Sequence, residues 1–183
     1  MKRLVLLLMS LALAACSGHT IYRFEVNLLS FIPQNQRQGE LNLTTSQILF
    51  PDDPAGQLVE VPGAEALVDG RLYLETTLKN TGTVSSTLDI EVHLGPGSDT
   101  DLYDGQGGDF TLIQQSITLN PGEERAVSVP LDVQPGTQAF DLIKAGKFRL
   151  GARLSLSGER VQCTLNQAEI VLRLKLFNLI PNP

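Results

Sequence analysis

The sequence lacks tryptophan, and side chains that commonly carry catalysis or metal binding are few. It has two histidines, two cysteines and 5% aromatic residues. Two histidines are too few for a histidine-based zinc site. A Ser-His-Asp triad would need His93 in a cleft, whereas its place beside Glu91 on the polar side of an alternating segment predicts an exposed side chain. We therefore expect a non-catalytic protein without a cofactor.

Positive charge is also scarce. The chain has 14 lysines and arginines against 20 aspartates and glutamates, which gives a net charge of −6. Nucleic-acid binding needs a basic surface, so we expect no nucleic-acid partner. Long apolar segments are missing as well. The N-terminal segment 4–15 is too short to cross a bilayer of about 30 Å as a helix.

What is present at the N-terminus is a leader. Lys2 and Arg3 precede the apolar segment, and small residues follow it, as in a secretory signal peptide. The residues Leu13-Ala14-Ala15-Cys16 resemble the bacterial lipobox. That resemblance implies export, cleavage before Cys16 and acylation of both its thiol and its new amino group with palmitate-like chains. The alternative is an ordinary signal peptide cut near Ala15, which leaves a free cysteine.

The resemblance divides the chain into a signal peptide (1–15), a lipidated tether (16–21) and one domain (22–180). Two or three acyl chains make release from a membrane negligible. The tether spans at most about 17 Å when extended, so the domain is expected close to the lipid headgroups. Ser17, which follows the cysteine where aspartate often means inner-membrane retention, favours the outer membrane of a two-membrane cell envelope.

Apolar residues alternate with polar ones through most of the remaining chain. This period of two predicts strands with one buried and one wetter face, arranged as antiparallel sheets packed face to face. The segment 41–50 does not keep one parity, which predicts a bulge or a crossing between sheets. The expected strands are 22–29, 41–50, 58–61, 71–79, 86–94, 111–119, 125–133, 147–156 and 169–177.

One segment has a helical pattern instead. Thr137 is a suitable N-cap, Phe140 and Ile143 lie three residues apart, and Gly146 is a suitable C-terminal stop. We expect a short helix near 138–145 at one end of the sandwich. The predicted fold class is thus all-β, an antiparallel immunoglobulin-like β-sandwich with one short helix.

Two turns carry a resemblance that covers about residues 70–135. Asn80-Thr81-Gly82 forms an N-x-G turn, and Pro121-Gly122-Glu123 forms a P-G-E turn some forty residues later. The pair is similar to turns of bacterial immunoglobulin-like and cell-adhesion-related β-sandwich modules. The early strands and the helix bring the chain nearer to late-embryogenesis-abundant β-sandwich proteins, a second resemblance. Neither family implies a catalytic role.

The loop 97–110 is rich in aspartate and glycine. Hard oxygen ligands on a flexible loop suit Ca²⁺, and Asp99, Asp101 and Asp104 are the candidate ligands. Their spacing does not match an EF-hand, so a solvated loop between strands is the alternative. Cys163, in register with Val161 and Leu165, is expected to be a buried core thiol.

The C-terminal part of the chain has a basic excess. If strands 147–156 and 169–177 pair, their outward side chains place five cations on one face, which predicts a surface for an acidic partner or anionic headgroups. An edge that blocks aggregation is the alternative. The five residues are Lys147, Arg149, Arg153, Arg173 and Lys175.

These observations favour a membrane-anchored lipoprotein of the cell envelope that binds or scaffolds another envelope protein. The alternative is a ligand-binding module for Ca²⁺ or glycans. The lack of tryptophan argues against glycans, because sugar-binding surfaces commonly use aromatic faces. Tyr73 and Tyr103 are the obvious substitutes.

Overall fold

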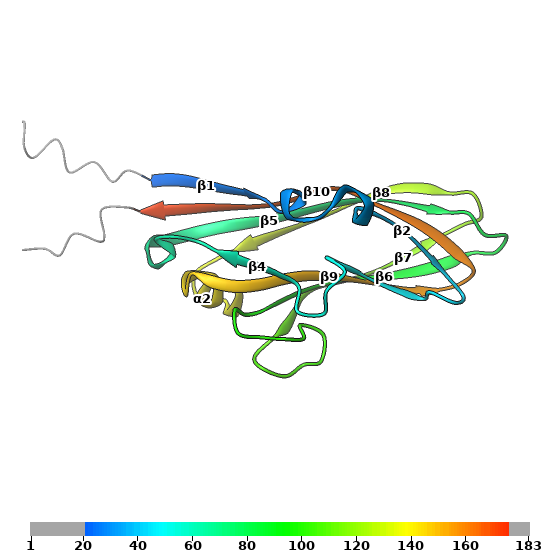
Figure 1. The fold of residues 1–183 in the computed structure, drawn as a ribbon. Coiled ribbons are helices and arrows are strands. Elements are labelled where there is room, and N and C mark those ends of the chain that lie inside the picture. The colour runs from blue at the N-terminus through cyan, green and yellow to red at the C-terminus, as the bar shows by residue number, and fades with distance from the viewer. Residues whose placement is uncertain (1–20, 176–183) are drawn as a thin grey trace, which may run out of the picture.

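A computed structural model describes residues 21–175, so the predicted signal peptide, Cys16, most of the predicted tether and the last residues of the predicted domain lie outside the described residues. Two antiparallel sheets face each other (Figure 1). Sheet A contains β1 (Ile21–Asn27), β2 (Gln38–Asn42), β5 (Leu67–Asn80), β8 (Glu124–Val133) and β10 (Arg160–Lys175). Sheet B contains β3 (Gln47–Phe50), β4 (Gln57–Glu60), β6 (Ser86–Pro96), β7 (Phe110–Leu119) and β9 (Lys147–Ser157).

The strands pair in nested order along the chain. β1 pairs with β10, β3 with β9, β5 with β8, and β6 with β7. The sheets therefore run β1-β10-β5-β8 and β3-β9-β6-β7, while β2 and β4 add to β10 and β9. The predicted antiparallel sandwich is confirmed. Its eight-strand nested order is that of a double-sheet jelly roll, so the likeness to an immunoglobulin domain holds for the two layers and not for the strand order.

The core lies between the sheets and follows the alternation of the sequence. The inward residues of β6 and β9 are almost all buried: Leu88, Ile90, Val92, Leu94, Phe148, Leu150, Ala152 and Leu154. The facing residues of sheet A include Leu72, Leu78, Val129, Ile170 and Leu172. Because one parity of each strand is apolar, the two sheets can bury a continuous interface without a disulfide.

Two irregularities break the parity of the sequence, and both have a geometric cause. The segment 41–50 forms two strands in different sheets, because β2 pairs with β10 and β3 with β9. This confirms the predicted crossing. In β10 the register shifts between Leu165 and Gln167, so that Cys163 and Leu165 face the core before the bulge and Ala168 faces it afterwards.

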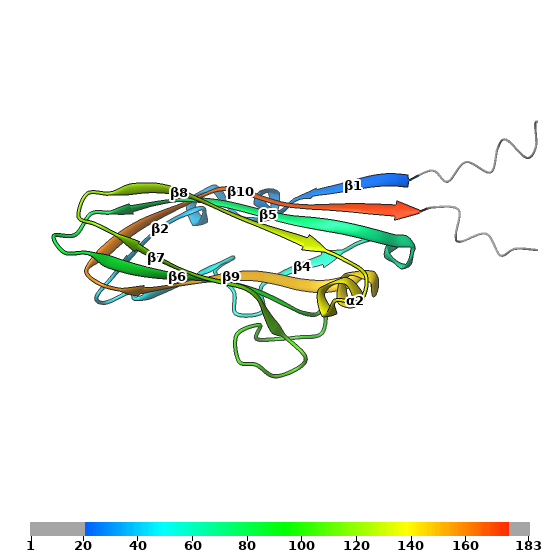
Figure 2. The ribbon, with the colours of Figure 1, turned by 180° about the vertical axis from the view of Figure 1, so that it is seen from behind.

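The short helix is also confirmed as α2 (Gln138–Lys144). The Thr137 hydroxyl accepts the N–H of Phe140, and Gly146 has a φ of +84° directly after the C-cap. Phe140 and Ile143 are buried, which ties α2 to one end of the sandwich (Figure 2). Between residues 21 and 175 no helix is both long and apolar enough to cross a membrane.

Candidate functional site

The loop 97–109, which joins β6 to β7, folds back over the outer face of sheet B (Figure 1). Leu102 anchors it. Its side chain is fully buried, and its main-chain N–H donates to the carbonyl of Pro54 at 2.9 Å. Arg149 adds a second attachment, since its guanidinium donates to the carbonyls of Gly97, Ala55 and Gly56 at 3.2–3.3 Å. The loop is therefore docked on the sheet by both apolar and polar contacts.

Glycines form the floor on which the loop rests. Gly95 of β6 and Gly151 of β9 both occupy positions on the outer face of sheet B. A Cβ at Gly95 would lie 2.5 Å from Leu102 Cδ2, and one at Gly151 would overlap with the Tyr103 hydroxyl. Only glycine permits this approach, because any side chain would push the loop away. Glycine at outward positions of two strands was the only feature of the sequence that could have indicated this close approach of the loop.

The docked loop buries a polar cluster of four residues, Glu91, His93, Tyr103 and Arg153. Arg153 Nε donates to Glu91 Oε2 at 2.6 Å, and its guanidinium lies 5.4 Å from the centre of the Tyr103 ring. His93 Nε2 lies 3.4 Å from the same Glu91 oxygen, and the His93 and Tyr103 rings meet edge to face at 4.8 Å. The cluster thus connects two strands of sheet B to the loop above them.

The expectation of an exposed His93 was wrong. Its side chain does point away from the core, as the alternation predicted, but only 4% of the residue is exposed. Tyr103 from the loop lies against the ring and excludes water. Sequence parity correctly identified the outer face, but it carries no information on whether a distant loop covers that face.

The electrostatics of the cluster favour a fixed ion pair. Partial burial acts to raise the pKa of Glu91, but hydrogen bonds from Arg153 and His93 and their charges outweigh it, so the pKa lies below its ordinary value of 4.5. Burial raises the pKa of the Tyr103 phenol well above its ordinary range. An ionised carboxylate already bound by arginine and a neutral phenol are poor general bases and nucleophiles at neutral pH.

The aspartates of the loop do not converge as the sequence predicted. Asp99 Oδ1 accepts the N–H of Asp101, Asp101 Oδ1 accepts that of Tyr103, and Asp104 Oδ1 accepts that of Gln106. Each aspartate therefore uses one carboxylate oxygen to hold a local turn, by accepting the main-chain N–H of the residue two positions later. Asp99 is buried, whereas Asp104 is exposed. In residues 21–175 no group of three or more acidic, histidine or cysteine side chains is placed to hold a metal ion.

The predicted basic face does not form, because it required strands 147–156 and 169–177 to pair with each other. β9 lies in sheet B and β10 in sheet A, so the two strands are not paired and their outward faces point in opposite directions. Consecutive strands commonly pair, which was the basis of the expectation. Here the chain crosses from sheet B back to sheet A after β9, and β10 pairs with β1, β2 and β5 instead.

Four of the five cations are also already engaged on their separate faces. Lys147 Nζ lies 2.8 Å from Glu60, and Arg153 pairs with Glu91. Arg173 Nε donates to Asp69 Oδ1 at 2.5 Å. Arg149 donates to loop carbonyls, as described above, and Lys175 closes β10 opposite Ile21. The arrangement serves the fold rather than a common basic surface.

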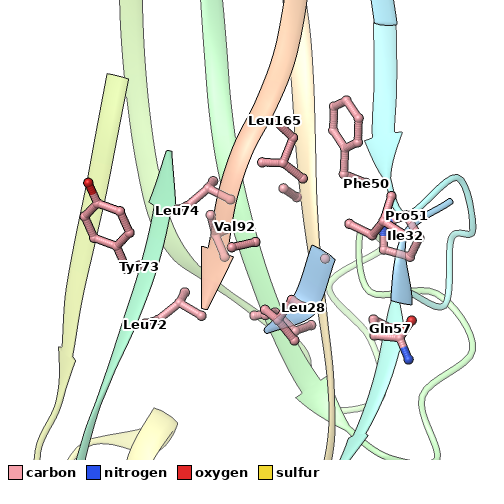
Figure 3. Close-up of a pocket in the computed structure, with 14 residues that line it drawn as sticks. Leu28, Ile32, Phe50, Pro51, Gln57, Leu72, Tyr73, Leu74, Val92 and Leu165 are labelled. Carbon is pink, nitrogen blue, oxygen red and sulfur yellow. The ribbon is translucent and has the colours of Figure 1, made fainter. Parts of the chain in front are cut away.

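An apolar cavity lies between the sheets (Figure 3). It has a volume of about 40 Å³ and is lined by core side chains of both sheets, among them Leu74, Val92 and Leu165. A cavity that holds one benzene molecule measures about 150 Å³, so this space is a packing gap rather than a ligand pocket.

The cysteine of β10 has the predicted environment. Cys163 is 1% exposed, and burial raises the pKa of its thiol to about 12. The neutral thiol is a weak nucleophile. Cys163 is therefore a packed core residue.

No known family model matches the sequence, and no curated protein matches it. Solved structures with a similar fold include the infectious bursal disease virus VP2 subviral particle, with 9% identity and a TM-score of 0.41 over 87% of this chain. Latent PorU from Porphyromonas gingivalis has 7% identity and a TM-score of 0.39 over 88% of this chain. The K1 adhesin domain of Lys-gingipain from the same organism has 13% identity and a TM-score of 0.35 over 81% of this chain. This chain spans 33% of the viral chain, 14% of PorU and 97% of the adhesin domain, and the likeness is one of fold alone.

Proposed function

We propose that this chain is a non-catalytic lipoprotein of the bacterial cell envelope, anchored through Cys16, whose sandwich binds or scaffolds another envelope component. The observation that carries the proposal is the lipobox-like run Leu13-Ala14-Ala15-Cys16 directly before the fold. β1 begins at Ile21, so at most about 17 Å of chain separates the first strand from the acylated residue.

The position of β1 supports an end-on arrangement. Ile21 pairs with Lys175, so the start of the first strand and the end of the last lie side by side at one end of the sandwich (Figure 1). Ile21 and Tyr22 are about half exposed there. In the proposed arrangement this end faces the bilayer, and amphipathic Tyr22 suits the headgroup region.

The opposite end then faces away from the membrane. The loops 43–46, 81–85 and 158–159 gather there, since Thr83 N–H donates to Glu159 at 2.6 Å and Thr81 N–H donates to the carbonyl of Arg160 at 3.1 Å. Leu43 is 81% exposed and Val84 is 47% exposed on these loops. Exposed apolar side chains on a tip held by hydrogen bonds suit contact with a protein partner.

Detergent phase partitioning of the full chain expressed in a bacterial host tests the anchor. We expect the wild-type protein in the detergent phase and the Cys16→Ser variant, expressed without residues 1–15, in the aqueous phase, because the apolar segment 4–15 would hold an uncut variant in detergent. Cys163→Ala is the matched control, because it removes the other cysteine of the chain and should partition like the wild type. A wild-type protein that partitions into water, or a Cys16→Ser variant that stays with detergent, would overturn the proposal.

A further inference from the structure

Two carboxylate oxygens are buried in the docked loop without a hydrogen-bond partner among the described residues. They are Asp99 Oδ2 and Asp109 Oδ1. Asp99 as a whole is 8% exposed. Buried polar atoms in native proteins are almost always paired, and an unpaired carboxylate oxygen is among the most costly of them. These two atoms therefore call for a ligand.

Each carboxylate uses one oxygen to shape the loop and leaves the other free. Asp99 Oδ1 accepts the N–H of Asp101 at 3.1 Å, and Asp109 Oδ2 accepts the N–H of Gly105 at 3.2 Å. The turns thus fix both side chains in place. The two remaining oxygens are held in position by the loop itself, as pre-organised ligands are.

The two side chains border the same small space. The position of a Cβ on Gly95 would lie 3.0 Å from Asp99 Oδ2 and 3.2 Å from Asp109 Cβ. Gly107, with a φ of +65°, closes another side, where a Cβ would lie 3.1 Å from Asp99 Oδ2. The Leu102 methyl group borders the same point, 2.5 Å from the Cβ position on Gly95, so the space lies between the two carboxylates and the apolar anchor of the loop.

The nearest basic residues do not neutralise the pair. The Lys147 side chain passes Gly97, but its amine binds Glu60 at 2.8 Å. Arg149 donates to Gly97, Ala55 and Gly56 carbonyls. Both cations are therefore engaged with other groups of the described chain.

We propose that Asp99 and Asp109 bind a divalent cation, Ca²⁺, with the remaining positions filled by loop carbonyls and water. Carboxylate and carbonyl oxygens on an irregular loop are the ligands that Ca²⁺ takes. With two carboxylates, the site belongs with extracellular modules of Kd about 10⁻⁴–10⁻³ M. The inference goes beyond the proposed function. It retains Asp99 from the sequence prediction and replaces Asp101 and Asp104 by Asp109.

The cation would join the two ends of the loop. Asp99 follows β6, and Asp109 directly precedes β7. Leu102 and Tyr103, which cover the Glu91–His93–Arg153 cluster, lie between them. Binding therefore stabilises the docked loop and, through it, the whole sheet.

Thermal unfolding and calorimetric titration of the full chain in detergent, freed of metal with a chelator, test the site. At about 10 mM Ca²⁺, some tenfold above the weaker expected Kd, the wild-type Tm should rise by about 3–5 °C. Asp99→Asn and Asp109→Asn should lose this rise and the binding heat. Asp101→Asn and Asp104→Asn are matched controls that keep the charge change and should retain both.

A second readout separates cation binding from loop structure. Asp99→Asn keeps the turn-forming oxygen and removes the buried charge, so without Ca²⁺ its Tm should equal or exceed that of the wild type. A wild-type protein without binding heat or Tm rise at millimolar Ca²⁺ overturns the proposal. So does a Ca²⁺ response that survives in both Asp99→Asn and Asp109→Asn, or one that Asp101→Asn abolishes.

Discussion

The outer faces of the two sheets use similar ion pairs in different surroundings. On sheet A, Arg71 and Asp132 lie 2.8 Å apart with side chains 61% and 57% exposed. On sheet B, Arg153 and Glu91 are 25% and 17% exposed, because the loop 97–109 covers them. Water screens the first pair and competes for its hydrogen bonds, whereas the second pair is largely withdrawn from water.

The difference shows which face depends on its charges. A surface pair contributes little, but removal of one partner of a buried pair leaves the other charge without compensation. One outer face thus carries exposed ion pairs, and a loop covers part of the other.

Removal of one partner from each pair should give the largest contrast. We expect Arg153→Met to lower the free energy of unfolding by about 2 kcal/mol, less than for a fully buried pair, and Arg71→Met by under about 0.5 kcal/mol. Urea unfolding measures both. The double variant Arg153→Met/Glu91→Gln should recover part of the loss, because no charge is then left unpaired. Equal losses in the two single variants would show that the loop does not make the Arg153–Glu91 pair more important for stability than the Arg71–Asp132 pair.

A methyl group on the glycine floor should be the next most harmful change. Gly151→Ala places a Cβ against the Tyr103 hydroxyl and should cost about 1–2 kcal/mol. The double variant Gly151→Ala/Tyr103→Phe removes the overlapping oxygen and should be more stable than Gly151→Ala alone. If Gly151→Ala has the stability of the wild type, the loop does not rest on this strand.

The partly buried carboxylate of Glu91 should also make the stability of the protein depend on pH in acid. The pKa of Glu91 is lower in the folded protein than its ordinary 4.5, so its contribution is present above that pH and is lost as the pH falls through the folded value. Glu91→Gln should therefore be less stable than the wild type by about 1 kcal/mol near pH 7. The gap should narrow in urea unfolding near pH 3.5. A gap that widens in acid would contradict the sign of this shift.

A small effect, close to that of Arg71→Met, is expected at the pair Asp69–Arg173 of sheet A. The hydrogen bond from Arg173, together with its charge, lowers the pKa of Asp69 against the opposing effect of burial, but the arginine is 52% exposed. Asp69→Asn should cost about 0.5 kcal/mol in the same assay. A loss as large as that of Arg153→Met would mean that the covered and open faces do not differ as we describe.

The sequence predicted most strands because each has one apolar parity, and it predicted α2 from Thr137 and Gly146. The first half of β10 (160–168) was missed, because the bulge near residue 166 changes the parity of that strand. The crossing within 41–50 was also visible, since a chain that changes sheets changes parity. The partners of β9 and β10 were not visible, because alternation assigns faces and not neighbours. The covering of His93 was missed for a similar reason. Leu102 and Tyr103 sit among aspartates and glycines, whose composition resembles that of a solvated loop.

The anchor at Cys16 is the claim on which the proposed orientation of both ends depends. Intact-mass analysis of the mature protein from bacterial membranes tests it most directly. We predict a chain that begins at Cys16 and carries the added mass of two or three acyl chains on that residue. A mature chain with an unmodified residue 16, or one that retains residues 1–15, would contradict the account.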